Sequence, residues 1–268
     1  MKITRPMDFL CVSEYLRYKA FAHHRRGQGI HSPFVFSLVS DVFRNKTGPD
    51  IVCSIEKIRK RLLADTRSLK VTDLGAGSRI MKSRVRKVSD IARYSSVPRK
   101  YGILLASMAS AFGRPGILEF GTSLGISTMY MAASCPEAEV ITMEGCPSVS
   151  EIAAGNFRKS GLNNINLLTG SFDELLPEII QRGISPGMIF IDGNHRREPI
   201  VRYFSQVAEI SGPESVVIID DIHSSREMTE AWVEIKNHEK VTLSVDVFRM
   251  GMVFFRKGLT RYDYIIRY

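Results

Sequence analysis

The chain has 268 residues, of which 44% are hydrophobic and 24% are charged. These values exclude a wholly disordered or fibrous protein, and the length suits one large domain or a core domain with an added lobe. The longest apolar stretches, such as residues 102–113, fall short of the roughly 18 residues that a membrane-spanning helix needs, and no secretory signal is evident. The four cysteines show neither a C-x-x-C pair nor metal-ligand spacing, so we expect a reduced, cytoplasmic protein without a membrane partner.

The net charge of +9 is distributed unevenly along the chain. Residues 1–100 hold 22 Lys and Arg against 8 Asp and Glu, whereas the remaining 168 residues hold 15 against 20. A basic segment of this kind predicts an acidic partner, which would be nucleic acid, a phosphorylated substrate or an anionic surface. The alternative is a solvated basic lobe that has no specific partner.

The N-terminal part of the chain is expected to be mainly helical up to about residue 65. The apolar residues of 34–43 fall on one helical face, and Ser32-Pro33 just before them is typical of a helix start. Residues 75–100 are rich in Gly, Ser, Arg and Lys, so we expect an exposed loop followed by a basic helix. The sequence therefore predicts a basic, mainly helical N-terminal lobe over residues 1–100.

From residue 101 onward, short apolar runs alternate with helical stretches, as in βαβ units that build a parallel sheet. The expected strands are Gly116–Phe120, Val140–Met143, Ile165–Leu168, Met188–Ile191 and Ser215–Ile219. The runs 241–248 and 252–256 flank a short turn and predict a closing antiparallel hairpin. We therefore expect an α/β domain over residues 101–258, followed by a C-terminal tail over 259–268.

A turn with two glycines follows the first strand of this domain. Gly121 and Gly125 allow the backbone to approach a ligand closely, and the helix that follows offers free N–H groups. Glu144 ends the next strand, 19 positions after Gly125, where a carboxylate can accept both hydroxyls of a ribose. The pattern predicts a site for a nucleoside cofactor; the alternative is an exposed Glu at a strand end.

Three acidic residues follow two further strands. Asp192 ends the fourth predicted strand, and Asp220-Asp221 ends the fifth. Because neighbouring parallel strands end on one rim of a sheet, the three carboxylates are expected to converge, and such oxygen ligands suit Mg²⁺ or Ca²⁺. In the alternative, Asp192 contacts cofactor or substrate while Asp220 and Asp221 cap the next helix.

On these motifs, residues 101–256 resemble a class I S-adenosylmethionine-dependent methyltransferase, with greatest similarity to the O-methyltransferase branch that includes the catechol and caffeoyl-CoA type enzymes. The E-x-G-x-x-x-G turn of that family is here Glu119-Phe-Gly-Thr-Ser-Leu-Gly125. The resemblance implies an α/β, Rossmann-like, seven-stranded and mostly parallel sheet with a terminal antiparallel hairpin. The cofactor-binding residues that it implies are Glu119, Gly121, Ser123, Gly125, Ser127, Glu144, Ser171 and Phe172.

The same resemblance implies roles for the acidic residues and a nearby histidine. It places a metal at Asp192, Asp220 and Asp221, although the catechol-type enzymes have Asn at the third position. His195 stands where those enzymes have a Lys general base, so His195 and Asp192 are the expected catalytic residues. The alternative is an exposed loop histidine that pairs with a nearby carboxylate.

The expected reaction is methyl transfer from S-adenosylmethionine to a hydroxyl oxygen of a small molecule, with or without a divalent cation. The main alternative is an RNA or other nucleic-acid methyltransferase that uses the basic lobe. Two further alternatives are an NAD-dependent oxidoreductase, because a glycine turn with Glu144 also fits the ribose of NAD, and a cofactor-binding protein without activity. The family's extra N-terminal helices also make a homodimer an expectation.

Overall fold

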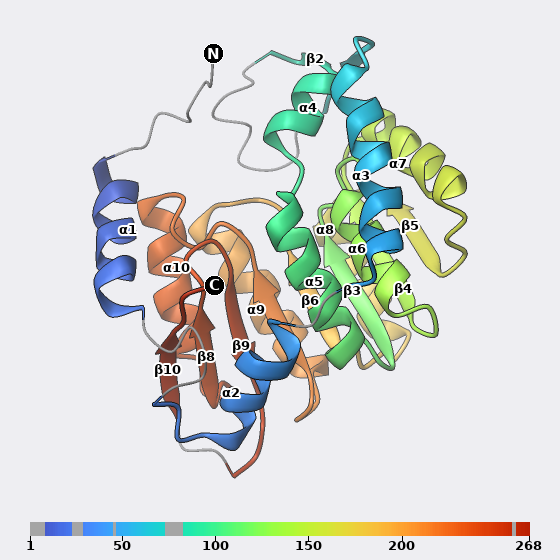
Figure 1. Ribbon diagram of the computed structural model, residues 1–268. Coiled ribbons are helices and arrows are strands. Elements are labelled where there is room, and N and C mark those ends of the chain that lie inside the picture. The colour runs from blue at the N-terminus through green and yellow to red at the C-terminus, as the bar shows by residue number, and fades with distance from the viewer. Residues whose placement is uncertain (1–8, 23–28, 45–46, 73–82, 259–260) are drawn as a thin grey trace.

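The computed structural model describes residues 9–22, 29–44, 47–72, 83–258 and 261–268. Its centre is an eight-stranded sheet in the order β10-β8-β9-β7-β6-β3-β4-β5 (Figure 1). All neighbouring pairs in this sheet are parallel except those that involve β9. The strands are β3 (Gly116–Phe120), β4 (Glu139–Glu144), β5 (Ile165–Thr169), β6 (Met188–Ile191), β7 (Val216–Ile219), β8 (Leu243–Asp246), β9 (Gly251–Phe254) and β10 (Tyr262–Ile265).

The predicted fold class is confirmed, and the closing hairpin is β8–β9. The predicted count of seven strands is too low by one, because the segment expected to be a tail contributes β10. This strand pairs in parallel with β8, from Tyr262 opposite Leu243 to Ile265 opposite Asp246. Pairing there satisfies the backbone groups of the β8 edge, and the next residue, Ile266, is fully buried against the sheet.

Helices cover both faces of the sheet (Figure 1). One face carries α3 (Pro49–Ala64), α5 (Arg99–Phe112), α6 (Ile126–Ser134) and α7 (Pro147–Ser160). The other face carries α8 (Phe172–Gln181), α9 (Arg197–Ile210) and α10 (Arg226–Lys236). Every residue of β6 and β7 is buried, as expected for strands that are covered on both sides.

The N-terminal segment is mainly helical and packs into the same core as the sheet. It contributes α1 (Phe9–Phe21), α2 (Pro33–Ser37), a turn of π-helix (Leu38–Val42), α4 (Val88–Tyr94) and the small hairpin β1 (Ser68–Lys70) with β2 (Val85–Lys87). Ser32 caps α2 as expected, because its side chain accepts a hydrogen bond from the backbone nitrogen of Val35 at 3.4 Å. Val35 and Ile55 belong to the buried cluster that also holds Tyr130 and Leu243.

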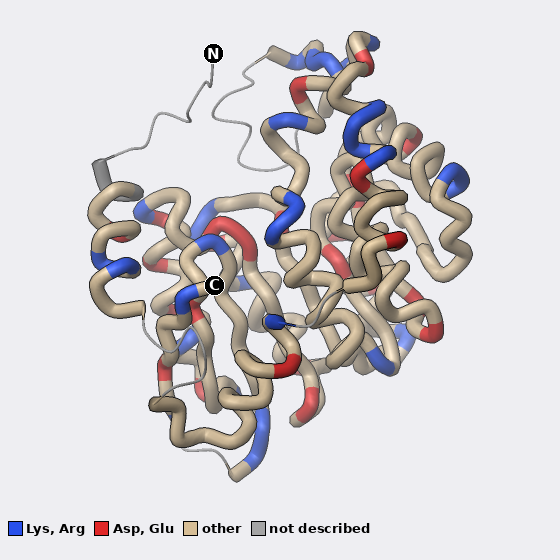
Figure 2. The backbone as a smooth tube through the Cα atoms, in the orientation of Figure 1, with Lys and Arg blue, Asp and Glu red and all other residues tan. Residues whose placement is uncertain are grey.

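The predicted loop at the start of 75–100 lies mostly outside the described residues. Lys and Arg residues are frequent in β2 and α3, which lie close together at the upper end of the molecule (Figure 2). No helix in the described ranges is both long and apolar enough to cross a membrane.

Candidate active site

The site lies at the edge of the sheet where the parallel strands end. Strand β3 has β4 on one side and β6 on the other, and the connections from β3 to β4 and from β6 to β7 run in opposite directions along the sheet. Such a switch point opens a crevice beyond the carboxyl ends of the strands, and ligands of open α/β sheets bind there. The glycine turn, Glu144 and Asp192 all follow strands that end at this point.

The turn after β3 approaches the loop after β6 closely. Gly121 has a φ of +95°, and a Cβ at this position would collide with the backbone carbonyl of Asp192. Gly125, with a φ of +82°, stands at the start of α6, and a Cβ there would collide with the ring of Phe157. Both predicted glycines are therefore required by their backbone conformation and by their neighbours.

Glu119 lies beneath this turn and is fully buried. Its carboxylate accepts hydrogen bonds from the hydroxyls of Ser127 at 2.5 Å and Thr142 at 2.7 Å, and from that of Thr128. Burial raises the pKa of Glu119 to about 7, although these three hydroxyls act in the opposite direction. Glu119 thus ties β3 to β4 and to the first turn of α6, while its predicted contact with a cofactor stays a prediction.

Glu144 connects the glycine turn to the next crossover. One carboxylate oxygen accepts from the backbone nitrogen of Ser123 at 2.8 Å, and the other accepts from that of Cys146 at 2.9 Å. The carboxylate is therefore fixed beside the turn.

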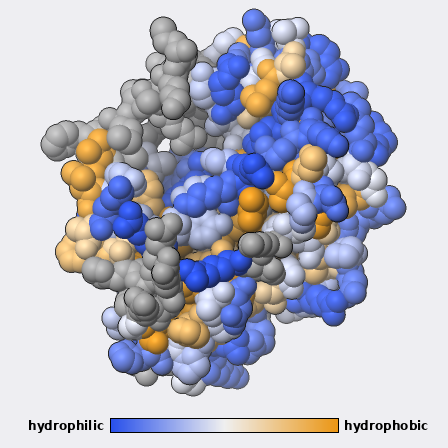
Figure 3. Space-filling model, in the orientation of Figure 1, coloured by the Kyte–Doolittle hydropathy of each residue, from blue (hydrophilic) through white to orange (hydrophobic). Residues whose placement is uncertain are grey.

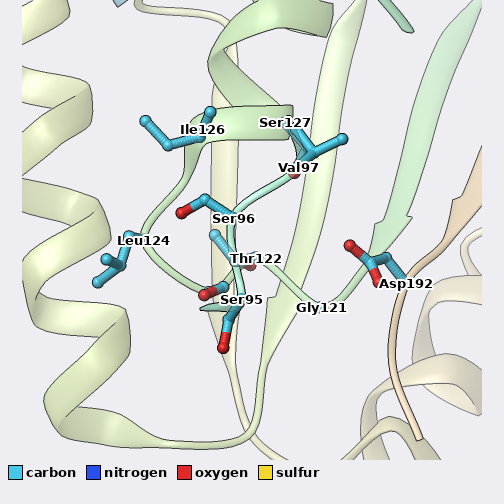
Figure 4. Close-up of a pocket in the computed structure, with 10 residues that line it drawn as sticks. Ser95, Ser96, Val97, Gly121, Thr122, Leu124, Ile126, Ser127 and Asp192 are labelled. Atoms are coloured by element: carbon cyan, nitrogen blue, oxygen red, sulfur yellow. The ribbon is translucent and has the colours of Figure 1, made fainter. Parts of the chain in front are cut away.

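A small hollow of about 10 Å³ lies between the turn and Asp192 (Figure 4). The residues that line it are Ser95, Ser96, Val97, Gly121, Thr122, Ser123, Leu124, Ile126, Ser127 and Asp192. Ser95 to Val97 belong to the link between α4 and α5, so the N-terminal segment forms one wall. Among the described residues, the buried Ser96 hydroxyl has no hydrogen-bond partner. Sequence reasoning missed Ser96, because no local pattern marks a wall residue from another part of the chain.

Ser171 and Phe172 follow β5 on the same rim, outside this hollow. The Ser171 side chain caps α8 in a reciprocal arrangement with Glu174, so its hydroxyl is already used. The Phe172 ring packs edge-on against Phe120, with ring centroids 5.4 Å apart, and a Cβ on Gly193 would collide with it. Phe172 is therefore held beside the loop that carries Asp192.

Two of the three carboxylates of the predicted metal site are engaged by an arginine. The guanidinium of Arg249 binds both carboxylate oxygens of the fully buried Asp220, and it lies 3.4 Å from Asp221. Burial raises the pKa of Asp220 above its usual range, and the Arg249 guanidinium opposes this. Within the described part of the chain, no group of three or more His, Cys, Asp or Glu side chains is arranged to hold a metal. Asp192, Asp220 and Asp221 share the rim, but they do not fit a magnesium or calcium ion.

His195 contacts Asp192, as expected. Its Nε2 lies 3.4 Å from Oδ1 of Asp192, and the imidazole is about one third exposed. The other nitrogen, Nδ1, has no hydrogen-bond partner among the described residues. Burial lowers the pKa of His195, but the Asp192 hydrogen bond and charge, with Asp221 and Asp220, raise it to about 9. A histidine oriented by a carboxylate, with one nitrogen unengaged, is the arrangement of a general base.

A second His–Asp pair on this rim was missed by sequence reasoning. His223 Nε2 lies 2.7 Å from Oδ2 of Asp246, which ends β8. The Phe248 ring stacks on His223, with centroids 5.6 Å apart, and covers the imidazole. The two residues are 23 positions apart, so only the hairpin geometry brings them together.

Comparison with known proteins agrees with this geometry. Residues 118–222 match a family model described as a methyltransferase domain. A catechol O-methyltransferase of Niastella koreensis is 32% identical over 130 residues, which are 47% of this chain and 58% of that protein. A catechol O-methyltransferase of Mycobacterium tuberculosis is 26% identical over 129 residues, 47% of this chain and 57% of that protein. The chain thus spans less than two thirds of these curated relatives.

A solved structure extends the likeness at the level of the fold. An O-methyltransferase from Bacillus cereus, crystallised with S-adenosylhomocysteine, has a TM-score of 0.55 at 20% identity, covering 82% of this chain and 97% of its own. In fold and in the sequence of residues 118–222, the chain is thus similar to class I S-adenosylmethionine-dependent methyltransferases. The curated relatives that the chain matches are named O-methyltransferases, so the expected resemblance to that branch is confirmed.

The buried Glu119 predicts an unusual dependence of stability on pH. The folded protein keeps a proton on Glu119 that the unfolded chain loses above pH 4.5, so the free energy of unfolding should fall as pH rises from 4.5 to about 7. The loss should reach about 3 kcal/mol. Urea unfolding across this range is expected to show a flatter profile for Glu119→Gln. The exposed Glu178→Gln is the matched control and should keep the wild-type slope; equal slopes in all three proteins would contradict the role of Glu119.

Proposed function

We propose that this chain transfers a methyl group from S-adenosylmethionine to a hydroxyl oxygen of a small molecule. The observation that carries the proposal is the hollow at the switch point, with the glycine turn and Glu144 on one side and Asp192 on the other. Bound there, the cofactor supplies an electrophilic methyl group on a positively charged sulfur. The names of the curated relatives support a hydroxyl oxygen as the acceptor atom.

The residues around the hollow fit such a cofactor. Glu144 would accept hydrogen bonds from the ribose hydroxyls, since its carboxylate is fixed by two backbone N–H groups. Gly121 and Gly125 leave room for close approach, while Ser123 and the start of α6 supply the backbone. The unpartnered Ser96 hydroxyl would donate to a polar end of the ligand.

The remaining predicted residues take supporting positions in this proposal. Glu119 would act from beneath, by holding Ser127 and Thr128 at the start of α6. Phe172 would offer a ring face or edge to the adenine, and Ser171 would take part through its backbone because its hydroxyl caps α8. Glu119 and Ser171 take these roles because their side-chain oxygens already form hydrogen bonds within the protein.

On the acceptor side, His195 would take the hydroxyl proton at its unengaged Nδ1. Asp192 accepts from Nε2 and thereby fixes the orientation of the ring and stabilises the cation that forms. Because the pKa of His195 is about 9, most of the histidine holds a proton at neutral pH. Turnover should therefore rise with pH up to about 9.

The expected homodimer, the nucleic-acid partner and the cytoplasmic location remain proposals. Apolar residues gather over α1 (Figure 3), where Leu16 and Phe21 are 63% and 59% exposed, and this supports a homodimer. The same view shows hydrophilic residues lining the hollowed centre of this face. The nucleic-acid alternative rests on the charge of residues 1–100 alone, and a cytoplasmic location rests on cysteine content.

The glycine turn provides a matched pair of variants for cofactor binding. Gly121→Ala should weaken binding of S-adenosylhomocysteine at least tenfold, because the new Cβ would push the turn away from Asp192. Gly161→Ala is the control: it also has a positive φ, +73°, but nothing lies within 4 Å of its Cβ position. Calorimetric titration of both variants measures the difference. Equal affinities would show that the turn does not form the cofactor site.

The two histidines on the rim can be separated in the same way. His195→Gln should lower kcat by a factor of about 10²–10⁴ while binding of S-adenosylhomocysteine stays unchanged. The covered His223→Gln should keep turnover near the wild-type value. Radiolabelled methyl transfer to a panel of catechols and other phenols measures turnover. If turnover were lost in His223→Gln and normal in His195→Gln, the general base would be His223 of the His223–Asp246 pair.

A further inference from the structure

A buried arginine from the turn between β8 and β9 lies at the acidic rim. The Nε of Arg249 donates to Oδ1 of Asp220 at 2.9 Å, and its Nη2 donates to Oδ2 at 2.6 Å. Nη2 also lies 3.4 Å from Oδ1 of Asp221. One guanidinium thus binds one and lies close to the other of two carboxylates that the family resemblance assigns to a divalent cation.

The position of this guanidinium is fixed by the fold around it. The backbone nitrogen of Ile222 donates to the carbonyl oxygen of Arg249 at 3.2 Å, which ties the turn to the residue after Asp221. The guanidinium carbon lies 5.7 Å from the centre of the Tyr101 ring. The side chains of Arg249 and Asp220 are 16% and 0% exposed. Displacing Arg249 would leave two desolvated charges without partners, which is strongly unfavourable.

A magnesium ion would compete for the same atoms. It requires nearly octahedral oxygen ligands at about 2.0–2.1 Å, and it releases its own water reluctantly. Both oxygens of Asp220 already accept charge-assisted hydrogen bonds in a bidentate pair, the geometry for which a guanidinium is best suited. The oxygens that would have to form the metal shell therefore point at a fixed cation.

We infer that Arg249 is the built-in counter-cation of this rim and that it takes the place of a divalent metal and excludes it. Arg249 is a positioning residue: it acts on a reacting group only through Asp220 and Asp221. One consequence, which rests on the proposed function, is that an acceptor is not held by metal chelation. A compound with a single hydroxyl should then serve as well as a vicinal diol.

Binding of Mn²⁺, followed by electron paramagnetic resonance on EDTA-treated protein, tests this inference. The wild type should show no saturable Mn²⁺ binding at millimolar concentration, and its Tm should be the same in EDTA and in millimolar Mg²⁺. Arg249→Met should bind Mn²⁺ and gain Tm on its addition, because the aspartates lose their counter-cation. Saturable binding to the wild type at millimolar Mn²⁺ or below, or no binding to a folded Arg249→Met, would overturn the inference.

Arg256→Met provides the matched control, because Arg256 forms a 2.7 Å pair with Glu214 away from the rim. This variant should behave as the wild type in both measurements. If Arg249→Met does not fold, the wild type alone decides, since a saturable signal overturns the inference and its absence supports it. Neither readout uses methyl transfer or the cofactor, so this inference and the proposed function can fail independently.

Discussion

The contact between the backbone of Gly121 and the carbonyl of Asp192 fixes the geometry on which the rest of the site depends. It joins the ends of β3 and β6, two neighbouring parallel strands whose following helices lie on opposite faces of the sheet, and it is possible only because residue 121 has no Cβ. On one side of this contact, the turn leads into α6 and lies beside Glu144. On the other side, the loop presents Asp192 and His195. The hollow lies beside this contact.

Buried charge around this contact is compensated in two different ways. Glu119 is surrounded by three hydroxyls, which are neutral donors, so burial dominates and the carboxyl holds its proton more tightly. Asp220 is paired with a full positive charge on Arg249. Both arrangements engage nearly all the donors and acceptors near the strand ends, which makes the rim rigid. Ser96 Oγ, His195 Nδ1 and His223 Nδ1 are among the buried atoms of the described residues that have no hydrogen-bond partner.

Local patterns in the sequence were sufficient to predict the elements that form the rim. The strands β3 and β6 have the expected bounds, because their apolar runs are short, continuous and followed by turn residues. The glycine turn and Glu144 could be predicted for a similar reason, since their spacing reflects one strand–helix–strand unit. His195 and Asp192 are three residues apart, and their contact follows from one loop.

Contacts between distant segments could not be predicted in this way. Arg249 meets Asp220 from 29 positions away, because β9 pairs with β7 in a particular register. No sequence pattern near Asp220 indicates that an arginine will bind its carboxylate. Ser96 reaches the hollow through the packing of α5 against the sheet, and β10 joins the sheet through the unpaired edge of β8. These contacts are features of the structure that the family motif alone does not predict.

The most direct test of the account is calorimetric titration of the wild-type protein with S-adenosylhomocysteine and, separately, with NAD⁺. The account predicts a single site with micromolar affinity for S-adenosylhomocysteine and no measurable binding of NAD⁺. The same ribose-binding carboxylate fits both compounds, so the comparison separates the two classes of cofactor. Binding of NAD⁺ without binding of S-adenosylhomocysteine would contradict the central claim.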